Sequence, residues 1–132
     1  METDVDAIQV MFVESPNGPE GSREAFKKLE SRLASLKGRK FYATFQYTNG
    51  PYRACVAIEK DDNPVALGFD TWTIPGGTYA RGRLENWTER LGDIPNAFTR
   101  LSEEYRGRID RSRPSIEFYK SQTELIVFLP IR

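Results

Sequence analysis

Apolar residues recur at intervals of three and four in two stretches of the chain, residues 22–37 and 94–108. The recurring positions are Phe26, Leu29, Leu33 and Leu36 in the first stretch and Ile94, Phe98, Leu101 and Tyr105 in the second. This spacing places each set on one face of an α-helix, so it predicts two amphipathic helices. Ser22 is a residue type that caps helix N-termini, and Gly38 suits a left-handed C-terminal cap.

Short apolar and aromatic segments bounded by turn residues predict strands around both helices. The predicted strands are residues 7–13, 41–47, 52–59, 78–84, 115–120 and 124–131. The order strand, helix, strand, strand therefore occurs twice, at an offset of about 70–75 residues.

This pattern predicts one α+β domain over residues 1–132, a tandem of two β-α-β-β modules at about 7–60 and about 70–131. We expect antiparallel sheets with the helices on one side. A ligand cleft between the modules would be lined by strand residues that point away from the helices.

Glu117 lies inside the largely apolar segment SIEFYK, where superposition of the two repeats puts it near Tyr42. Alternation along a strand places Ile116 and Phe118 on one face and Glu117 and Tyr119 on the other. We expect the apolar pair to contact a helix and the polar pair to face the cleft.

A carboxylate at this place must reach water or serve a function. The alternatives to a functional role are a solvated strand residue or an ion pair with an arginine such as Arg53 or Arg113.

The chain holds six tyrosines and two tryptophans. Both residue types combine an apolar ring with a polar group and suit half-wet clefts, although for any single one of them core or surface packing is the simpler explanation. Rings around a carboxylate attract flat conjugated molecules and organic cations. The candidate ligand-binding residues are Glu117, Tyr119, Tyr42, Tyr47, Tyr52, Trp72 and Trp87.

Charge and composition exclude several classes of function. Lys plus Arg and Asp plus Glu both number 19, so the basic excess typical of nucleic-acid and anionic-membrane binders is absent. The chain has no histidine and one cysteine, Cys55, which excludes Ser-His-Asp catalysis, histidine metal sites and internal disulfides. We expect no metal and no cofactor. The N-terminal METDVDAI lacks a signal-peptide pattern, and we expect a cytoplasmic protein.

The segments IPGGTYARGRL, SRPSIEFYKS and ELIVFLPI, together with the repeat, resemble the GyrI-like small-molecule-binding domain. That family includes the gyrase-inhibitory protein and the effector-binding domains of bacterial multidrug-responsive transcription activators. The resemblance implies two β-α-β-β modules and a cleft with a glutamate at its floor and aromatic walls. Glu117 matches that glutamate by motif. The sequence has no helix-turn-helix segment, so we do not expect it to control transcription directly.

Three functions stay open at this point. The first is binding of flat aromatic or cationic small molecules. The second, implied by stand-alone relatives that resemble hydrolases, is detoxification of cyclopropane-bearing DNA-alkylating compounds, with Glu117 activating water and Tyr119 assisting. The third is a protein-interaction module. Either a monomer or a homodimer is compatible with the sequence.

Overall fold

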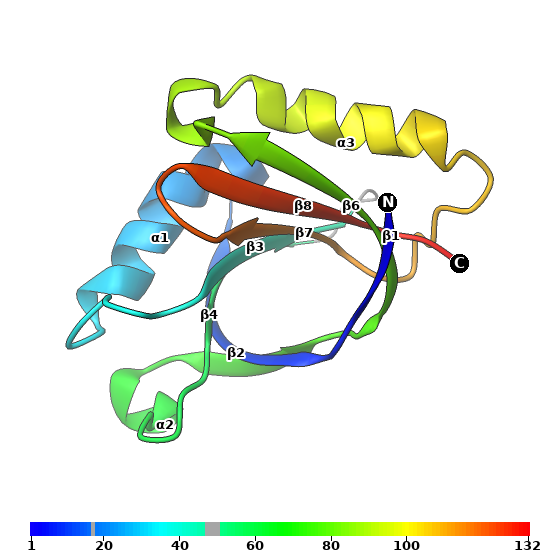
Figure 1. The fold of residues 1–132 in the computed structure, drawn as a ribbon. Coiled ribbons are helices and arrows are strands. Elements are labelled where there is room, and N and C mark those ends of the chain that lie inside the picture. Colours follow the sequence, from blue (N-terminus) through cyan, green and yellow to red (C-terminus); the bar gives the residue numbers. More distant parts are fainter. Residues whose placement is uncertain (17, 47–50) are drawn as a thin grey trace.

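The computed structural model describes residues 1–16, 18–46 and 51–132, and its centre is an eight-stranded antiparallel sheet that curls strongly (Figure 1). The strands are β1 (Glu2–Val5), β2 (Ile8–Ser15), β3 (Phe41–Phe45), β4 (Tyr52–Ala57), β5 (Asp70–Ile74), β6 (Gly77–Glu85), β7 (Ser115–Tyr119) and β8 (Glu124–Pro130). The helices are η1 (Gly18–Gly21), α1 (Ser22–Ser31), α2 (Pro64–Leu67), η2 (Trp87–Glu89) and α3 (Asp93–Glu104). The predicted α+β class and antiparallel pairing are confirmed.

The strand order is β1-β6-β8-β7-β3-β4-β2-β5. Pairing of β3 with β7 joins the strands of the first half to those of the second. The two edge strands lie beside strands of the opposite half, because β1 pairs with β6 and β5 pairs with β2. The sheet is therefore continuous across the whole chain.

Apolar side chains fill both faces of this sheet. The inner face of the curl holds a cluster of Val10, Tyr42, Cys55, Ile74, Tyr79 and Ile116. On the outer face, Leu29 of α1 packs with Met11, Ala54 and Val56, and Phe98 and Leu101 of α3 pack with strands β6 and β8. Both long helices thus cover the outside of the curl, as Figure 1 shows.

Strand β7 presents its side chains in the opposite sense to the sequence-based expectation. Phe118 is paired with Tyr42, and Ile116 and Phe118 belong to the inner cluster, so neither contacts a helix. Glu117 and Tyr119 lie on the outer, helix-bearing face. A flat, one-sided sheet would have put its apolar residues toward the helices, but a curled sheet buries its inner face as well. The cleft is consequently not lined by residues that point away from the helices.

Element ends also differ from the prediction. Helix α1 ends at Ser31 rather than near residue 37, and its N-cap is Gly21 rather than Ser22. Gly38 adopts a left-handed conformation (φ 74°), but in the connection to β3 and not as the helix cap. Strands β1 and β5 were not predicted, because short polar edge strands such as ETDV lack an apolar face. No helix in the described part of the chain is long and apolar enough to cross a bilayer.

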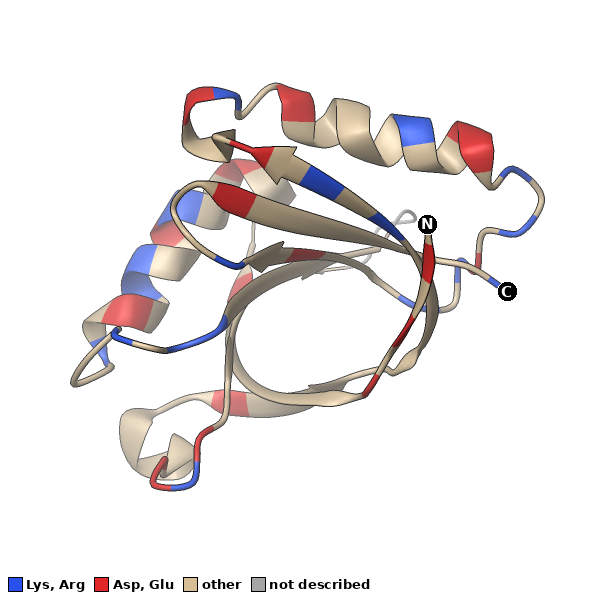
Figure 2. Ribbon diagram, viewed as in Figure 1, with Lys and Arg blue, Asp and Glu red and all other residues tan. Residues whose placement is uncertain are grey.

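Both α1 and α3 carry acidic and basic residues (Figure 2). The surface of these two helices therefore presents no single-sign field of the kind that attracts nucleic acid or anionic lipid.

Candidate functional site

A cavity of about 630 Å³ opens on the outer face of the sheet between the two long helices. Helix α1 contributes Phe26 to it, η2 contributes Trp87, and the first turn of α3 contributes Ile94. Strand β7 forms the floor through Glu117 and Tyr119. We call this cavity the interhelix cleft.

The Glu117 side chain is placed by its position in the middle of the sheet. Its neighbours across the strands are Ala43 of β3 and Val127 of β8, and the residue is 8% exposed. The Tyr119 hydroxyl donates a hydrogen bond of 2.7 Å to its Oε1 atom. Within the described ranges, no lysine or arginine forms an ion pair with this carboxylate. Glu117 is therefore a buried acid that is hydrogen-bonded but not neutralised.

The two arginines considered as partners are engaged elsewhere. Arg113 contacts Asp110 at 2.9 Å and donates to the backbone oxygen of Ile131 at 2.7 Å. Arg53 pairs with Glu14 on the inner face of the curl, 3.3 Å away. The ion-pair explanation of Glu117 is not supported.

Burial governs the ionisation of the groups at the cleft floor. Loss of hydration raises the pKa of Glu117, and the hydrogen bond from Tyr119 opposes this rise without cancelling it. Burial, and then the nearby Glu117 charge, also raise the pKa values of Tyr52 and Tyr119. Both phenols are therefore protonated near neutral pH and available as donors.

Tyr52 extends this polar group toward α1. Its hydroxyl lies beside the hydroxyls of Tyr119 and Ser22, and Tyr119 in turn donates to Glu117. Polar side chains therefore line the cleft floor from the first turn of α1 to the buried carboxylate.

Aromatic rings form the walls above this floor. The Tyr119 ring meets Phe26 edge to face, with centroids 5.4 Å apart and planes at 89°. On its other side, Trp87 lies 5.1 Å away at a tilt of 48°. The Trp87 indole nitrogen donates to the Ser121 backbone oxygen at 2.9 Å, which fixes the ring. Three aromatic rings from three separate elements therefore line the cleft.

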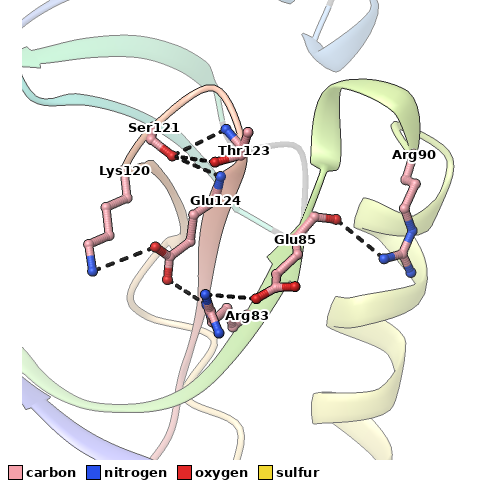
Figure 3. Close-up of polar contacts among 7 residues, drawn as sticks. All are labelled: Arg83, Glu85, Arg90, Lys120, Ser121, Thr123 and Glu124. Atoms are coloured by element: carbon pink, nitrogen blue, oxygen red, sulfur yellow. Dashed lines mark hydrogen bonds and ion pairs between the residues drawn. The ribbon is translucent and has the colours of Figure 1, made fainter.

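The turn at Ser121, which accepts the hydrogen bond from Trp87, is held in place by a polar network (Figure 3). The Ser121 hydroxyl accepts from the backbone nitrogens of Thr123 at 3.2 Å and Glu124 at 3.0 Å. Arg83 bridges Glu124 and Glu85. Arg90 then donates to the Glu85 backbone oxygen at 3.3 Å, next to η2. Such exposed contacts contribute little free energy each, but together they fix the position of the Trp87 wall.

The structure brings together four of the predicted residues, Glu117, Tyr119, Tyr52 and Trp87. It places Tyr42 and Trp72 on the opposite face of the sheet. Tyr42 is stacked on Phe118 at 4.9 Å, and Trp72 packs edge to face on Phe12 at 6.4 Å. Tyr47 lies outside the described residues.

Sequence reasoning did not assign Phe26, Leu91 or Ile94 to the cleft. Phe26 and Ile94 were read as parts of core-facing helical stripes, and both are half-buried at the cleft. Leu91 is 57% exposed at the rim and belongs to no periodic pattern.

No group of three or more His, Cys, Asp or Glu side chains suited to a metal ion occurs in the described ranges. The chemistry that the cleft offers is a buried carboxylate that attracts positive charge or accepts a proton, two phenolic donors and apolar stacking surfaces.

Several solved structures have the same arrangement of strands and helices. An integron cassette protein from the mobile metagenome of Vibrio cholerae superposes with a TM-score of 0.70 at 13% identity, covering 100% of this chain and 95% of that protein. The protein SAV2435 bound to tetraphenylphosphonium gives a TM-score of 0.63 at 10% identity, covering 100% and 93%. This chain shares their fold.

A hydrolase from Listeria innocua is similar to the same degree, with a TM-score of 0.63, 12% identity and coverage of 100% of this chain and 91% of that one. At these identities the likeness establishes the fold and not the activity. No protein-family model and no curated protein matches the sequence.

Proposed function

We propose that this protein binds hydrophobic, aromatic organic cations in the interhelix cleft, with Glu117 as the neutralising group at its floor. In this proposal the chain is a tandem of two β-α-β-β modules, about residues 7–60 and 70–131, and the cleft lies where they meet. The observation that carries the proposal is the buried Glu117 carboxylate, which has a tyrosine partner but no basic one in the described part of the chain.

A buried carboxylate without a counter-ion is unfavourable in the empty protein. A ligand cation supplies the missing charge, and the interaction is strong because the cleft floor excludes water. Aromatic walls add stacking and attract cations through their ring faces. A neutral ligand would receive the stacking but would leave the carboxylate unpaired.

The size of the cleft fits this ligand class. A volume of about 630 Å³ lies within the usual range of roughly 300–1,000 Å³ for drug-sized ligands. The walls come from α1, η2 and the first turn of α3, so they do not belong to one rigid element. Tetraphenylphosphonium, bound to a protein of the same fold, is a ligand of this chemistry.

The test compares two probes of matched shape and opposite charge, tetraphenylphosphonium and tetraphenylborate, by isothermal titration calorimetry. The cation should bind the unmodified protein and the anion should not. Glu117→Gln should weaken cation binding by roughly 10- to 100-fold, or about 1.4–2.8 kcal/mol, because stacking survives while the charge attraction is lost. Glu103→Gln, at an exposed position on α3, is the control and should bind the cation normally.

Equal affinity for the two probes would contradict the proposal. So would unchanged cation binding in a folded Glu117→Gln protein.

A hydrolytic function is the second candidate, favoured by the raised pKa of Glu117. A base with a pKa nearer to neutrality accepts a proton more readily. As Glu117 takes a proton from water, the water oxygen bonds to a carbon of an activated cyclopropane. The ring carbon–carbon bond breaks and its electrons move to the conjugated carbonyl. The oxyanion formed there is stabilised by the Tyr52 or Tyr119 hydroxyl and then takes up the proton from Glu117.

Incubation with a spirocyclopropyl cyclohexadienone, followed by mass spectrometry, tests this second candidate. Hydrolysis adds one water to the compound, and Glu117→Gln should abolish the addition. Binding of the cation probe with no water addition would leave the protein as a binder only.

A further inference from the structure

A second cavity, of about 380 Å³, lies on the other side of the sheet. Thr44, Arg53 and Trp72 contribute to its lining, and strand pairing places all three on the inner face of the curl, whereas Glu117 is on the outer face. It is separate from the interhelix cleft and plays no part in the proposed cation binding.

Arg53 is held in this cavity by two aromatic rings. Its Cζ atom lies 4.5 Å from the centroid of Phe12 and 4.5 Å from that of Trp72. The rings themselves are 6.4 Å apart with planes at 74°, so the guanidinium sits in the corner between them. This contact fixes the group while leaving the N–H bonds at its edge free to point elsewhere.

Within the described residues, Arg53 donates a single side-chain hydrogen bond. Nε donates to Glu14 at 3.3 Å, and no hydrogen bond from either terminal nitrogen of Arg53 is found within residues 1–16, 18–46 and 51–132. The Glu14 side chain is 52% exposed, and an ion pair with so exposed a partner contributes little free energy. A ligand carboxylate can therefore compete with Glu14 for the guanidinium.

The charge in the described lining of the cavity is that of an arginine. Arg53 is the charged side chain in its described lining, which contains no Asp or Glu. Asp110 is hydrogen-bonded to Ser112, a residue of this lining, and also to Arg113 at 2.9 Å. Its pKa is lowered to about 2 by these hydrogen bonds, so it is a satisfied anion.

We propose that this cavity binds a small organic carboxylate, held by the edge of Arg53 and packed against the Trp72 ring. A planar guanidinium matches a carboxylate in two parallel hydrogen bonds. The remaining lining includes Pro51, Pro75 and Pro114, which offer an apolar surface for the body of the ligand. A phosphate dianion fits less well, because a single cation and this apolar surface would not satisfy its oxygens.

Nuclear magnetic resonance of the tryptophan indole N–H groups tests the proposal. The chain has two tryptophans, Trp72 in this cavity and Trp87 in the interhelix cleft, so each signal reports one site. Salicylate added up to about 10 mM should shift the Trp72 signal saturably and leave the Trp87 signal in place. Salicylamide, which has the same ring without the charge, and inorganic phosphate should shift neither.

Substitutions then assign the effect to Arg53. Arg53→Lys keeps the charge but loses the planar fork, and should weaken salicylate binding at least 10-fold. Glu14→Gln removes the competing carboxylate and should tighten binding about 2- to 3-fold. Arg100→Lys, at an exposed position on α3, is the matched control and should bind as the unmodified protein does.

The proposal is overturned if salicylate does not shift the Trp72 signal, if salicylamide shifts it equally, or if Arg53→Lys binds normally. None of these results depends on whether the interhelix cleft binds cations.

Discussion

The Glu117 side chain is kept in surroundings that disfavour its charged form. In an unfolded chain a glutamate titrates at about 4.3, and burial in the folded protein raises the pKa of Glu117 above its ordinary value. Other charged groups at the cleft are Arg23 and Glu30 of α1. Between its two pKa values the folded protein binds more protons than the unfolded one. The stability from Glu117 is thus complete at low pH and is lost as pH rises through the folded pKa.

We predict that Glu117→Gln is at least as stable as the unmodified protein at neutral pH. The amide carries no charge that burial would penalise, so the difference should shrink toward acid pH, where Glu117 is protonated. Urea unfolding of both proteins from about pH 4 to 8 measures it. A variant that is clearly less stable at neutral pH would show that Glu117 has a stabilising charge partner.

Substitution of Tyr119 should have the opposite effect and lower the stability of the protein. Tyr119→Phe removes the hydrogen bond to the Glu117 carboxylate and leaves that buried group unsatisfied, which should cost about 1–3 kcal/mol near neutral pH. The loss should diminish at acid pH. Tyr105→Phe, on the half-exposed end of α3, is a control that should change stability by about 0.5 kcal/mol or less. Equal stability of the two variants at neutral pH would contradict the assigned hydrogen bond.

Helix α1 contributes to both the core and the cleft, through residues on neighbouring turns. Leu29 is fully buried against the sheet, whereas Phe26 is half-buried at the cleft and contacts Tyr119. The same amphipathic stripe therefore provides both core packing and a cleft wall.

We predict that Leu29→Ala destabilises the protein by about 2–5 kcal/mol, because it empties a packed site. Phe26→Ala should cost less, about 1–2 kcal/mol, since part of the ring is already exposed. Phe26→Ala should also weaken tetraphenylphosphonium binding more than Leu29→Ala does. Thermal unfolding and calorimetric titration of both variants measure these effects. Greater destabilisation by Phe26→Ala would place that ring in the core.

The inner core cluster and the pairing of the edge strands connect the two halves of the molecule. The inner cluster combines Val10 and Cys55 of the first half with Ile74, Tyr79 and Ile116 of the second. The edge strands β1 and β5 pair with the opposite half. Each half packs its long helix on an outer cluster of its own, but the inner cluster needs strands from both halves.

We therefore predict a single cooperative unfolding transition. In urea, the far-ultraviolet and near-ultraviolet circular dichroism curves should coincide. Leu29→Ala in the first half and Leu101→Ala in the second should each lower the midpoint of that same transition. Two separable transitions, each sensitive to one substitution, would show that the halves fold independently.

Local sequence patterns determined much of this molecule. The apolar spacing located both long helices, and their α+β arrangement with an antiparallel sheet followed from the order of elements. Period-two alternation correctly grouped Glu117 with Tyr119, because a strand places alternate side chains on one face whatever surrounds it. The pairing of a buried acid with a phenol at the cleft could thus be anticipated from five residues of sequence.

Alternation along a strand does not specify which of its two faces meets the helices. The curl of the sheet decides this. It buries a second face, and so sends Ile116 and Phe118 to an inner core and Glu117 toward the helices. Tyr42 and Trp72 lie on the inner face because of the strand with which each pairs, a contact between residues distant in sequence. Tyr52 and Trp87 likewise join Glu117 at the cleft through contacts between residues distant in sequence. Side-chain periodicity is a property of each strand, whereas the face that becomes the cleft is set by long-range pairing and curvature.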